Sequence, residues 1–169
     1  MWVQGCTLAC PGCYNPGLFD PQGGHWMEAA DLAAQVNAAP GIRGLTLLGG
    51  EPLQQPQALL EFLRLASPEL DRVLYTGFSW AEIHADPAKA AVLKEVDFVA
   101  AGRYLRSRAS EANAWLGSDN KTLHELTGRI RIAEAPEARV EAYIRPDGSG
   151  LMTGFPPEDL KRWLEGKAA

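Results

Sequence analysis

Cysteine is scarce in this chain and confined to one place. Only three cysteines occur, and all of them lie between residues 6 and 13. An odd count, with no secretory signal before it, argues against a framework of disulfide bonds. We therefore expect reduced cysteines and, in the absence of a signal peptide, a cytoplasmic protein.

An excess of positive charge and long apolar runs are also lacking. Lys and Arg number 16 against 21 Asp and Glu, which gives a formal net charge of −5 at pH 7. A general nucleic-acid binder needs a basic face that neutralises phosphates, so we expect no nucleic-acid partner. No stretch approaches the roughly 20 apolar residues that span a bilayer, so we expect no membrane segment.

What the chain does contain is enough apolar sequence for one domain with a packed core. It has 169 residues, of which 46% are hydrophobic. Strand-like apolar runs alternate with helical patterns, which predicts an α/β fold with a parallel sheet and right-handed crossovers. The expected strands are 1–4, 45–48, 70–76, 96–100 and 129–132. The expected helices are 27–39, 57–66, one that begins with the capping-box pattern Ser79-Trp80-Ala81-Glu82, and 87–94. Residues 140–145 and 150–153 predict a β-hairpin, and 156–164 predict a final helix.

The three cysteines, Cys6, Cys10 and Cys13, are spaced C-x3-C-x2-C. Thiolates this close together form a soft ligand set, suited to zinc, copper(I) or an iron–sulfur cluster. A structural zinc site usually has four protein ligands, and a cubane cluster usually has four cysteines. A cubane held by three leaves one iron open to a small molecule. The alternatives are a zinc site completed by His25 and three unligated structural cysteines.

Two further motifs follow predicted strands. Gly49-Gly50-Glu51-Pro52 comes directly after the strand 45–48. Glycines at a strand end let a ligand approach the backbone, and the glutamate adds an acceptor for a cation. Thr76-Gly77-Phe78 closes the strand 70–76. Because ligands of α/β folds bind at the carboxyl ends of parallel strands, we place Thr76 and Gly77 near a ligand pocket.

Taken together, these motifs resemble those of the radical S-adenosyl-L-methionine (radical SAM) superfamily. The run Cys10-Pro11-Gly12-Cys13-Tyr14-Asn15 is similar to the C-P-G-C-Y-N of the proteins that activate anaerobic ribonucleoside-triphosphate reductase. The resemblance implies a 4Fe–4S cluster on the three cysteines, with SAM on its open iron. It also implies that Gly49, Gly50 and Glu51 contact the amino acid end of SAM, with Thr76 and Gly77 nearby. Tyr14 is expected to supply an aromatic contact.

The resemblance also implies a fold, a reaction and partners. We expect a single radical SAM domain over residues 1–169, a partial, open (β/α)6-like barrel. Its core would be about 1–135, and a C-terminal hairpin and helix would occupy 136–169. The reduced cluster would cleave SAM to methionine and a 5′-deoxyadenosyl radical, which abstracts hydrogen from a glycine of a partner glycyl-radical enzyme. A flavodoxin- or ferredoxin-type protein would donate the electron.

Leu116-Gly117-Ser118-Asp119-Asn120-Lys121 resembles the R-G-S-S-N-Q of the activases. The interpretations of this segment are a part of the pocket, a contact with a partner, or a plain surface turn. Two departures from the activase pattern leave alternatives open. Ala101 stands where an Asp is usual. The hairpin has no counterpart in the minimal activases. One alternative is a radical SAM enzyme that acts on another peptide or a small molecule. The other is a non-catalytic iron–sulfur or zinc-binding module.

Overall fold

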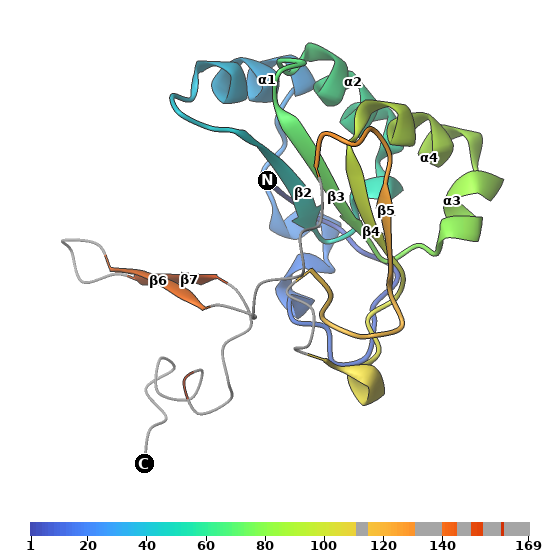
Figure 1. Cartoon of the computed structure of the whole chain (residues 1–169). Helices are drawn as coiled ribbons and strands as arrows, with labels where there is room; N and C mark the ends of the chain where they lie inside the picture. The colour runs from blue at the N-terminus through green and yellow to red at the C-terminus, as the bar shows by residue number, and fades with distance from the viewer. Residues whose placement is uncertain (111–114, 131–139, 145–149, 154–159, 161–169) are drawn as a thin grey trace.

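The computed structural model of the protein describes residues 1–110, 115–130, 140–144, 150–153 and 160. Its centre is a five-stranded sheet in the order β1-β2-β3-β4-β5 (Figure 1). The strands are β1 (Trp2–Val3), β2 (Gly44–Gly49), β3 (Asp71–Thr76), β4 (Phe98–Ala101) and β5 (Thr122–Glu125). Strands β1 to β4 run parallel, and β5 pairs antiparallel with β4. The four parallel strands therefore end at one edge of the sheet, called the carboxyl edge below.

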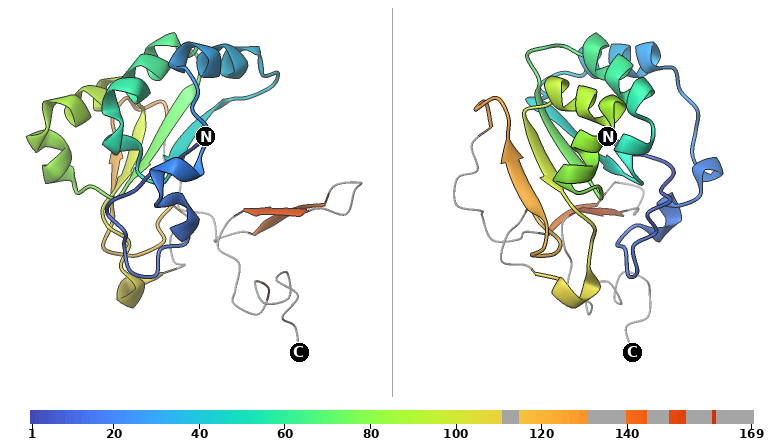
Figure 2. Two further views of the ribbon diagram at one scale, coloured as in Figure 1. Left: turned by 180° about the vertical axis from the view of Figure 1, so that it is seen from behind. Right: turned by 90° about the vertical axis from the view of Figure 1, so that its right-hand side faces the viewer.

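The helices that connect the parallel strands gather on one face of the sheet (Figure 2). They are α1 (Ala29–Ala38), α2 (Pro56–Leu65), α3 (Trp80–Ala85) and α4 (Pro87–Val92). Parallel neighbours need such crossovers because a tight turn cannot return the chain to the start of the next strand. The capping box predicted at the start of α3 is confirmed, since Ser79 and Glu82 each accept the other's backbone N–H.

The side chains of the central strands alternate between two apolar clusters. Leu47, Leu74 and Val99 face the helices and pack in one cluster with buried residues of α2 such as Phe62. Val73, Phe98 and Ala100 form the cluster on the opposite face, which is covered by partly buried Trp115, Leu116 and Ile130. Both faces of β4 are thus buried, which explains its continuous apolar sequence Phe-Val-Ala-Ala.

Most of the expected elements occur within a few residues of their expected positions, but one strand differs. Arg129 and Ile130, expected in a strand over 129–132, lie in bends, and 131–132 fall outside the described residues. The strand that continues the sheet is instead β5, whose sequence Thr-Leu-His-Glu contains a single strongly apolar residue. The sheet is therefore mixed, and the expectation of a purely parallel sheet is corrected. The described strands form an open α/β sheet, and a six-stranded barrel is not among their features.

The C-terminal hairpin is confirmed. Strands β6 (Glu141–Ile144) and β7 (Gly150–Thr153) pair antiparallel in a separate two-stranded sheet. The helix expected over 156–164 lies outside the described residues, apart from Leu160. Among the described residues, no helix has the length and apolar character needed to cross a membrane.

Candidate functional site

Glu51 links the ends of two strands at the carboxyl edge. Its side chain is only 1% exposed. Oε1 accepts hydrogen bonds from the Thr76 hydroxyl at 2.7 Å and from the Leu53 backbone N–H at 2.9 Å, and Oε2 accepts from the Gly77 N–H at 2.6 Å. Two of the predicted site residues, Thr76 and Gly77, are thus in direct contact with a third.

The environment of Glu51 acts on its pKa in two directions. Burial raises the pKa, because the charged form loses its hydration. The hydrogen bonds from Gly77, Thr76 and Leu53, and the charge of Arg103, lower it because they favour the carboxylate. The site is therefore arranged to hold a buried acidic group with most of its acceptor positions already occupied.

The backbone of the cysteine loop is bound to this same edge. The Glu51 N–H donates to the Gly5 carbonyl at 2.9 Å, next to Cys6. The Thr7 N–H donates to the Gln54 side-chain oxygen at 2.9 Å. Within the loop, the Cys13 N–H donates to the Cys10 carbonyl at 3.0 Å, and the Asn15 N–H donates to the Cys13 Sγ at 3.4 Å. The fold thus brings the cysteine loop and the Gly-Gly-Glu motif together, as expected from their sequence positions.

Close approach of backbones explains two of the glycines. A Cβ on Gly50 would lie 2.3 Å from the Gly5 carbonyl oxygen, so a larger residue would push the cysteine loop off the sheet. Gly12 has a φ of +76°, and a Cβ there would lie 2.8 Å from the Arg106 Cδ. Gly12 therefore lets the loop turn tightly while Arg106 packs across it.

The donor set fits an iron–sulfur cluster. All three cysteines are partly exposed and none is in a disulfide, so their sulfurs are available as ligands. The hydrogen bond to the Cys13 sulfur is of the kind that tunes such clusters. No group of three or more His, Cys, Asp or Glu side chains in the described part of the chain is placed to hold a single metal ion, and His25 is exposed. In a cubane each cysteine binds a different iron, so the three thiols need not converge on one point.

Tyr14 links the cysteine loop to the segment that follows β4, and Arg103 links that same segment to α3. The rings of Tyr14 and Tyr104 have their centroids 5.1 Å apart and are tilted by 56°, and Tyr14 is 44% exposed. Arg103 donates to both carboxylate oxygens of Glu82 at 2.8 and 2.9 Å, and also to the Gly77 carbonyl. The hydrogen bonds from Arg103 are the largest cause of the lowered pKa of Glu82, about 2. Arg103 thereby fixes α3 against the strand end that carries Gly77.

The departure at Ala101 and the segment 116–121 that resembles R-G-S-S-N-Q also have a structural place. Ala101 is 1% exposed and belongs to the cluster under the helices, where an aspartate would be buried in apolar surroundings. The segment 116–121 is more than a surface turn. Its Ser118 is fully buried, and the Asn120 side-chain amide donates to the Arg103 carbonyl at 2.9 Å. Both segments therefore help to shape the carboxyl edge.

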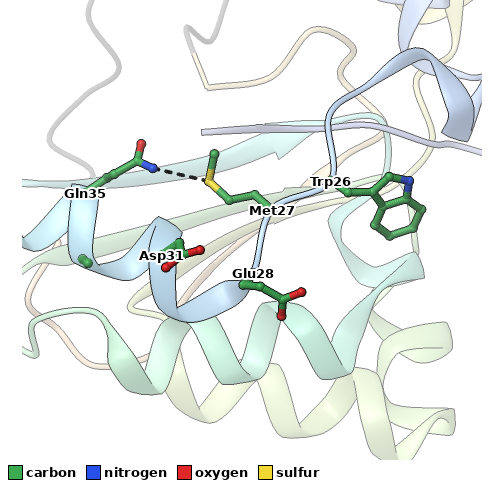
Figure 3. Close-up of a pocket in the computed structure, with 6 residues that line it drawn as sticks. Trp26, Met27, Glu28, Asp31 and Gln35 are labelled. Carbon is green, nitrogen blue, oxygen red and sulfur yellow. Dashed lines mark hydrogen bonds between the residues drawn. The ribbon is translucent and has the colours of Figure 1, made fainter.

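A separate hollow of about 610 Å³ lies beside α1, whereas the cysteine loop lies at the opposite end of the sheet (Figures 1 and 3). Its lining comes from residues 26–35 alone. Trp26, 88% exposed, points away from the others in Figure 3, and the Gln35 amide donates to the Met27 sulfur at 3.7 Å. The hollow contains none of the predicted site residues.

Comparison with known proteins agrees with the interpretation of the three cysteines as ligands of an iron–sulfur cluster. Residues 1–124 match the family described as "4Fe-4S single cluster domain". The anaerobic ribonucleoside-triphosphate reductase-activating protein of Pasteurella multocida is 33% identical over 140 residues, which cover 75% of this chain and 86% of the relative. The chain belongs to this family of activating proteins. Its relative in Enterobacteria phage T4 is 30% identical over 138 residues (77% and 85%), and that in Vibrio cholerae 29% over 136 residues (75% and 86%). No solved structure matches.

Membership of the activating-protein family confirms the resemblance inferred from the C-P-G-C-Y-N run. The matched span of the iron–sulfur domain includes every predicted site residue and ends within β5. Sequence reasoning did not identify the part that Arg103 plays at the carboxyl edge. The signal for Arg103 was its position directly after a strand end.

Proposed function

We propose that this protein carries a 4Fe–4S cluster on Cys6, Cys10 and Cys13 and uses it to cleave SAM. The product, a 5′-deoxyadenosyl radical, would generate a glycyl radical on an anaerobic ribonucleoside-triphosphate reductase. The observation that carries the proposal is the hydrogen bond between the Glu51 N–H and the Gly5 carbonyl. It fixes the start of the cysteine loop, next to Cys6, at the same edge of the sheet as the buried Glu51 carboxylate.

The acceptor count of Glu51 supports a role in holding the amino group of SAM. An ionised carboxylate offers about four acceptor positions. The described donors occupy three of them, from Thr76, Leu53 and Gly77. One position is therefore left for an ammonium group, in a buried setting where a charge-assisted hydrogen bond is strong. The same donors fix the orientation of the carboxylate before any ligand arrives.

The remaining predicted residues shape the pocket around that carboxylate. Gly49 and Gly50 let the backbones of β1 and the cysteine loop approach the end of β2 closely, since a Cβ on Gly49 would lie 2.4 Å from the Val3 nitrogen and one on Gly50 2.3 Å from the Gly5 carbonyl oxygen. Thr76 and Gly77 hold Glu51 in place, and we assign them to the pocket wall. Tyr14 is partly exposed and offers an aromatic face for the adenine, next to Tyr104.

Once bound and reduced, the cluster would supply one electron to the sulfonium of SAM, which breaks the bond between sulfur and the 5′-carbon. The contribution of the chain is to hold the amino acid end of SAM and to orient the 5′-carbon. The glycine of the partner would then lose its α-hydrogen to the radical. A flavodoxin- or ferredoxin-type protein is the proposed electron donor, and the cytoplasm, where thiols stay reduced, is the proposed compartment.

We also propose that the full fold is the partial (β/α)6-like barrel of radical SAM proteins. Four parallel strands that end at the cysteine loop support this, since cluster and SAM lie at that end in such barrels. The buried Ala101 removes one reason to prefer another substrate class, because its departure from the activase pattern has a packing explanation.

The test begins with anaerobic reconstitution with iron and sulfide, followed by dithionite and SAM and an assay for 5′-deoxyadenosine. The wild-type protein should bind a cluster and cleave SAM, and Cys10→Ala should abolish cleavage. The matched control is His25→Ala, which should leave iron content and cleavage unchanged. Addition of an anaerobic ribonucleoside-triphosphate reductase should then produce a glycyl radical signal by electron paramagnetic resonance (EPR).

Three outcomes would each contradict a different part of the proposal: the cluster, the identity of the metal, or the substrate. A Cys10→Ala protein that cleaves SAM at the normal rate would overturn the cluster assignment. Zinc binding that is lost in His25→Ala, with no iron bound, would favour the zinc module. SAM cleavage without any radical on the reductase would favour the alternative of another substrate.

A further inference from the structure

Lys121 is a cation at the carboxyl edge that the proposed reaction leaves without a role. The antiparallel register pairs Thr122 with Ala101, so Lys121 lies just beyond the end of β4. Gly102 leaves the room for it. A Cβ on Gly102 would lie 3.4 Å from the Lys121 Cα and 3.6 Å from its Cγ. The lysine stem is therefore packed along the end of the sheet, and its side chain is not free in solvent.

The charge of Lys121 is not neutralised by the described part of the chain. Arg103 is paired with Glu82, and Arg108 with Asp119, whereas the Lys121 ammonium has no ion pair or hydrogen bond with any residue that the structure describes. A partly buried cation without a partner is unfavourable unless a negative group lies near it.

The carboxyl edge at which Lys121 lies also holds the proposed site. There the Glu51 N–H donates to the Gly5 carbonyl, next to Cys6. Burial lowers the pKa of Lys121, and the negative charges of Cys10, Glu51 and Cys13 act in the opposite direction. Since Cys10 and Cys13 are two of the three proposed cluster ligands, the lysine and the proposed cluster share one edge of the sheet.

We propose that the Lys121 ammonium stabilises the one-electron-reduced state of the cluster and so makes this chain's cluster easier to reduce. The inference rests on the proposed function, because it needs the cluster. Reduction takes one electron from a low-potential, one-electron donor and makes the cluster and its thiolates more negative by one charge. A fixed positive charge nearby therefore favours the reduced form, and the net charge around iron–sulfur clusters is known to set their potential.

Simple electrostatics gives the size of the effect. At an effective dielectric constant of about 20, a unit charge placed roughly 10 Å from a cluster changes the equilibrium constant for its one-electron reduction by about tenfold. For a one-electron couple, tenfold corresponds to about 59 mV. Because Lys121 is partly buried, salt should screen this effect less than it screens a surface charge.

The test is a redox titration of reconstituted protein, followed by EPR and carried out without SAM. Lys121→Gln removes the charge and introduces the residue found in R-G-S-S-N-Q, so it should fold. Lys121→Arg keeps the charge. Lys94→Gln is the matched control, because Lys94 is exposed and precedes the opposite end of β4. Iron and sulfide content is measured for each protein first.

We expect the Lys121→Gln protein to bind as much iron as the wild type. The equilibrium constant for reduction of its cluster should be about tenfold smaller, which corresponds to a midpoint potential lower by about 59 mV. Lys121→Arg and Lys94→Gln should stay close to the wild-type value. An unchanged potential in Lys121→Gln overturns the inference, and so does an equal fall in Lys94→Gln. A Lys121→Gln protein that loses only SAM affinity also overturns it, since the lysine would then act on the ligand. If the wild-type protein assembles no cluster, the proposed function fails, and this inference fails with it.

Discussion

Glu51 offers the most demanding test of the site, because its carboxylate is predicted to serve both the fold and the ligand. Glu51→Ala would remove the acceptor of three donors at once, from Thr76, Leu53 and Gly77. A buried donor left without a partner costs about 1–3 kcal/mol. Water entering the vacated space would recover part of this, since the site is polar. We therefore expect a loss of about 3–5 kcal/mol, a large share of the 5–15 kcal/mol that typically stabilises a domain.

A second variant separates the two roles of Glu51. Glu51→Gln keeps one oxygen acceptor but turns an amide donor toward a neighbouring N–H or hydroxyl, so its stability should fall by only about 1–3 kcal/mol. It also loses the charge that would bind the ammonium of SAM. We expect SAM affinity to fall by about 1.5–3 kcal/mol, roughly ten- to a hundredfold.

The assay is urea unfolding of the cysteine-reduced protein, together with SAM binding to the reconstituted protein. Hydrogen exchange at the Gly77 and Leu53 amides gives a local readout, and both should exchange faster in Glu51→Ala. The control is Glu61→Ala on α2, an exposed position that should change stability by no more than about 0.5 kcal/mol. If Glu51→Ala were as stable as Glu61→Ala, the assignment of Glu51 as a link between strand ends would be refuted.

Two further predictions concern the elements around the site. Glu82 has a pKa held near 2, below its ordinary 4.5, mainly by Arg103, so its contribution is present above 4.5 and lost as pH falls toward 2. Glu82→Gln should flatten the acid side of the stability curve over that window, by only about 0.2–1 kcal/mol because the pair is exposed, and a thermal unfolding series against pH checks this. Gly12→Ala should strain the left-handed turn by about 1–2 kcal/mol and collide with Arg106, so it should retain less iron after reconstitution. Gly17→Ala, where a Cβ meets nothing within 4 Å, is the control, and equal iron retention in the two variants would contradict the steric argument.

Features that depend on residues close together along the chain could be predicted from the sequence. The spacing of three cysteines within eight residues fixes a ligand set whatever surrounds it, and the family match bears out the iron–sulfur interpretation. The capping box before α3 was predictable because a Ser three residues ahead of a Glu satisfies two backbone donors locally. The parallel strands β2 to β4 were predictable from short apolar runs, of which that of β4 is continuous and buried on both faces.

Features that depend on contacts between distant residues were not predictable. β5 has a weak local pattern, and it becomes a strand because β4 offers it a free edge of hydrogen-bonding groups. The sequence placed Thr76 near the same pocket as Glu51, but only the register of the sheet sets the hydrogen bond that joins the two side chains across 25 residues of chain. The register of β5 on β4 places Lys121 just beyond the end of β4, at the carboxyl edge. Residue types and spacing thus specified the chemistry of the ligands, whereas the packing of the strands specified which charges surround them, because electrostatic contacts depend on distance in space and not on separation along the chain.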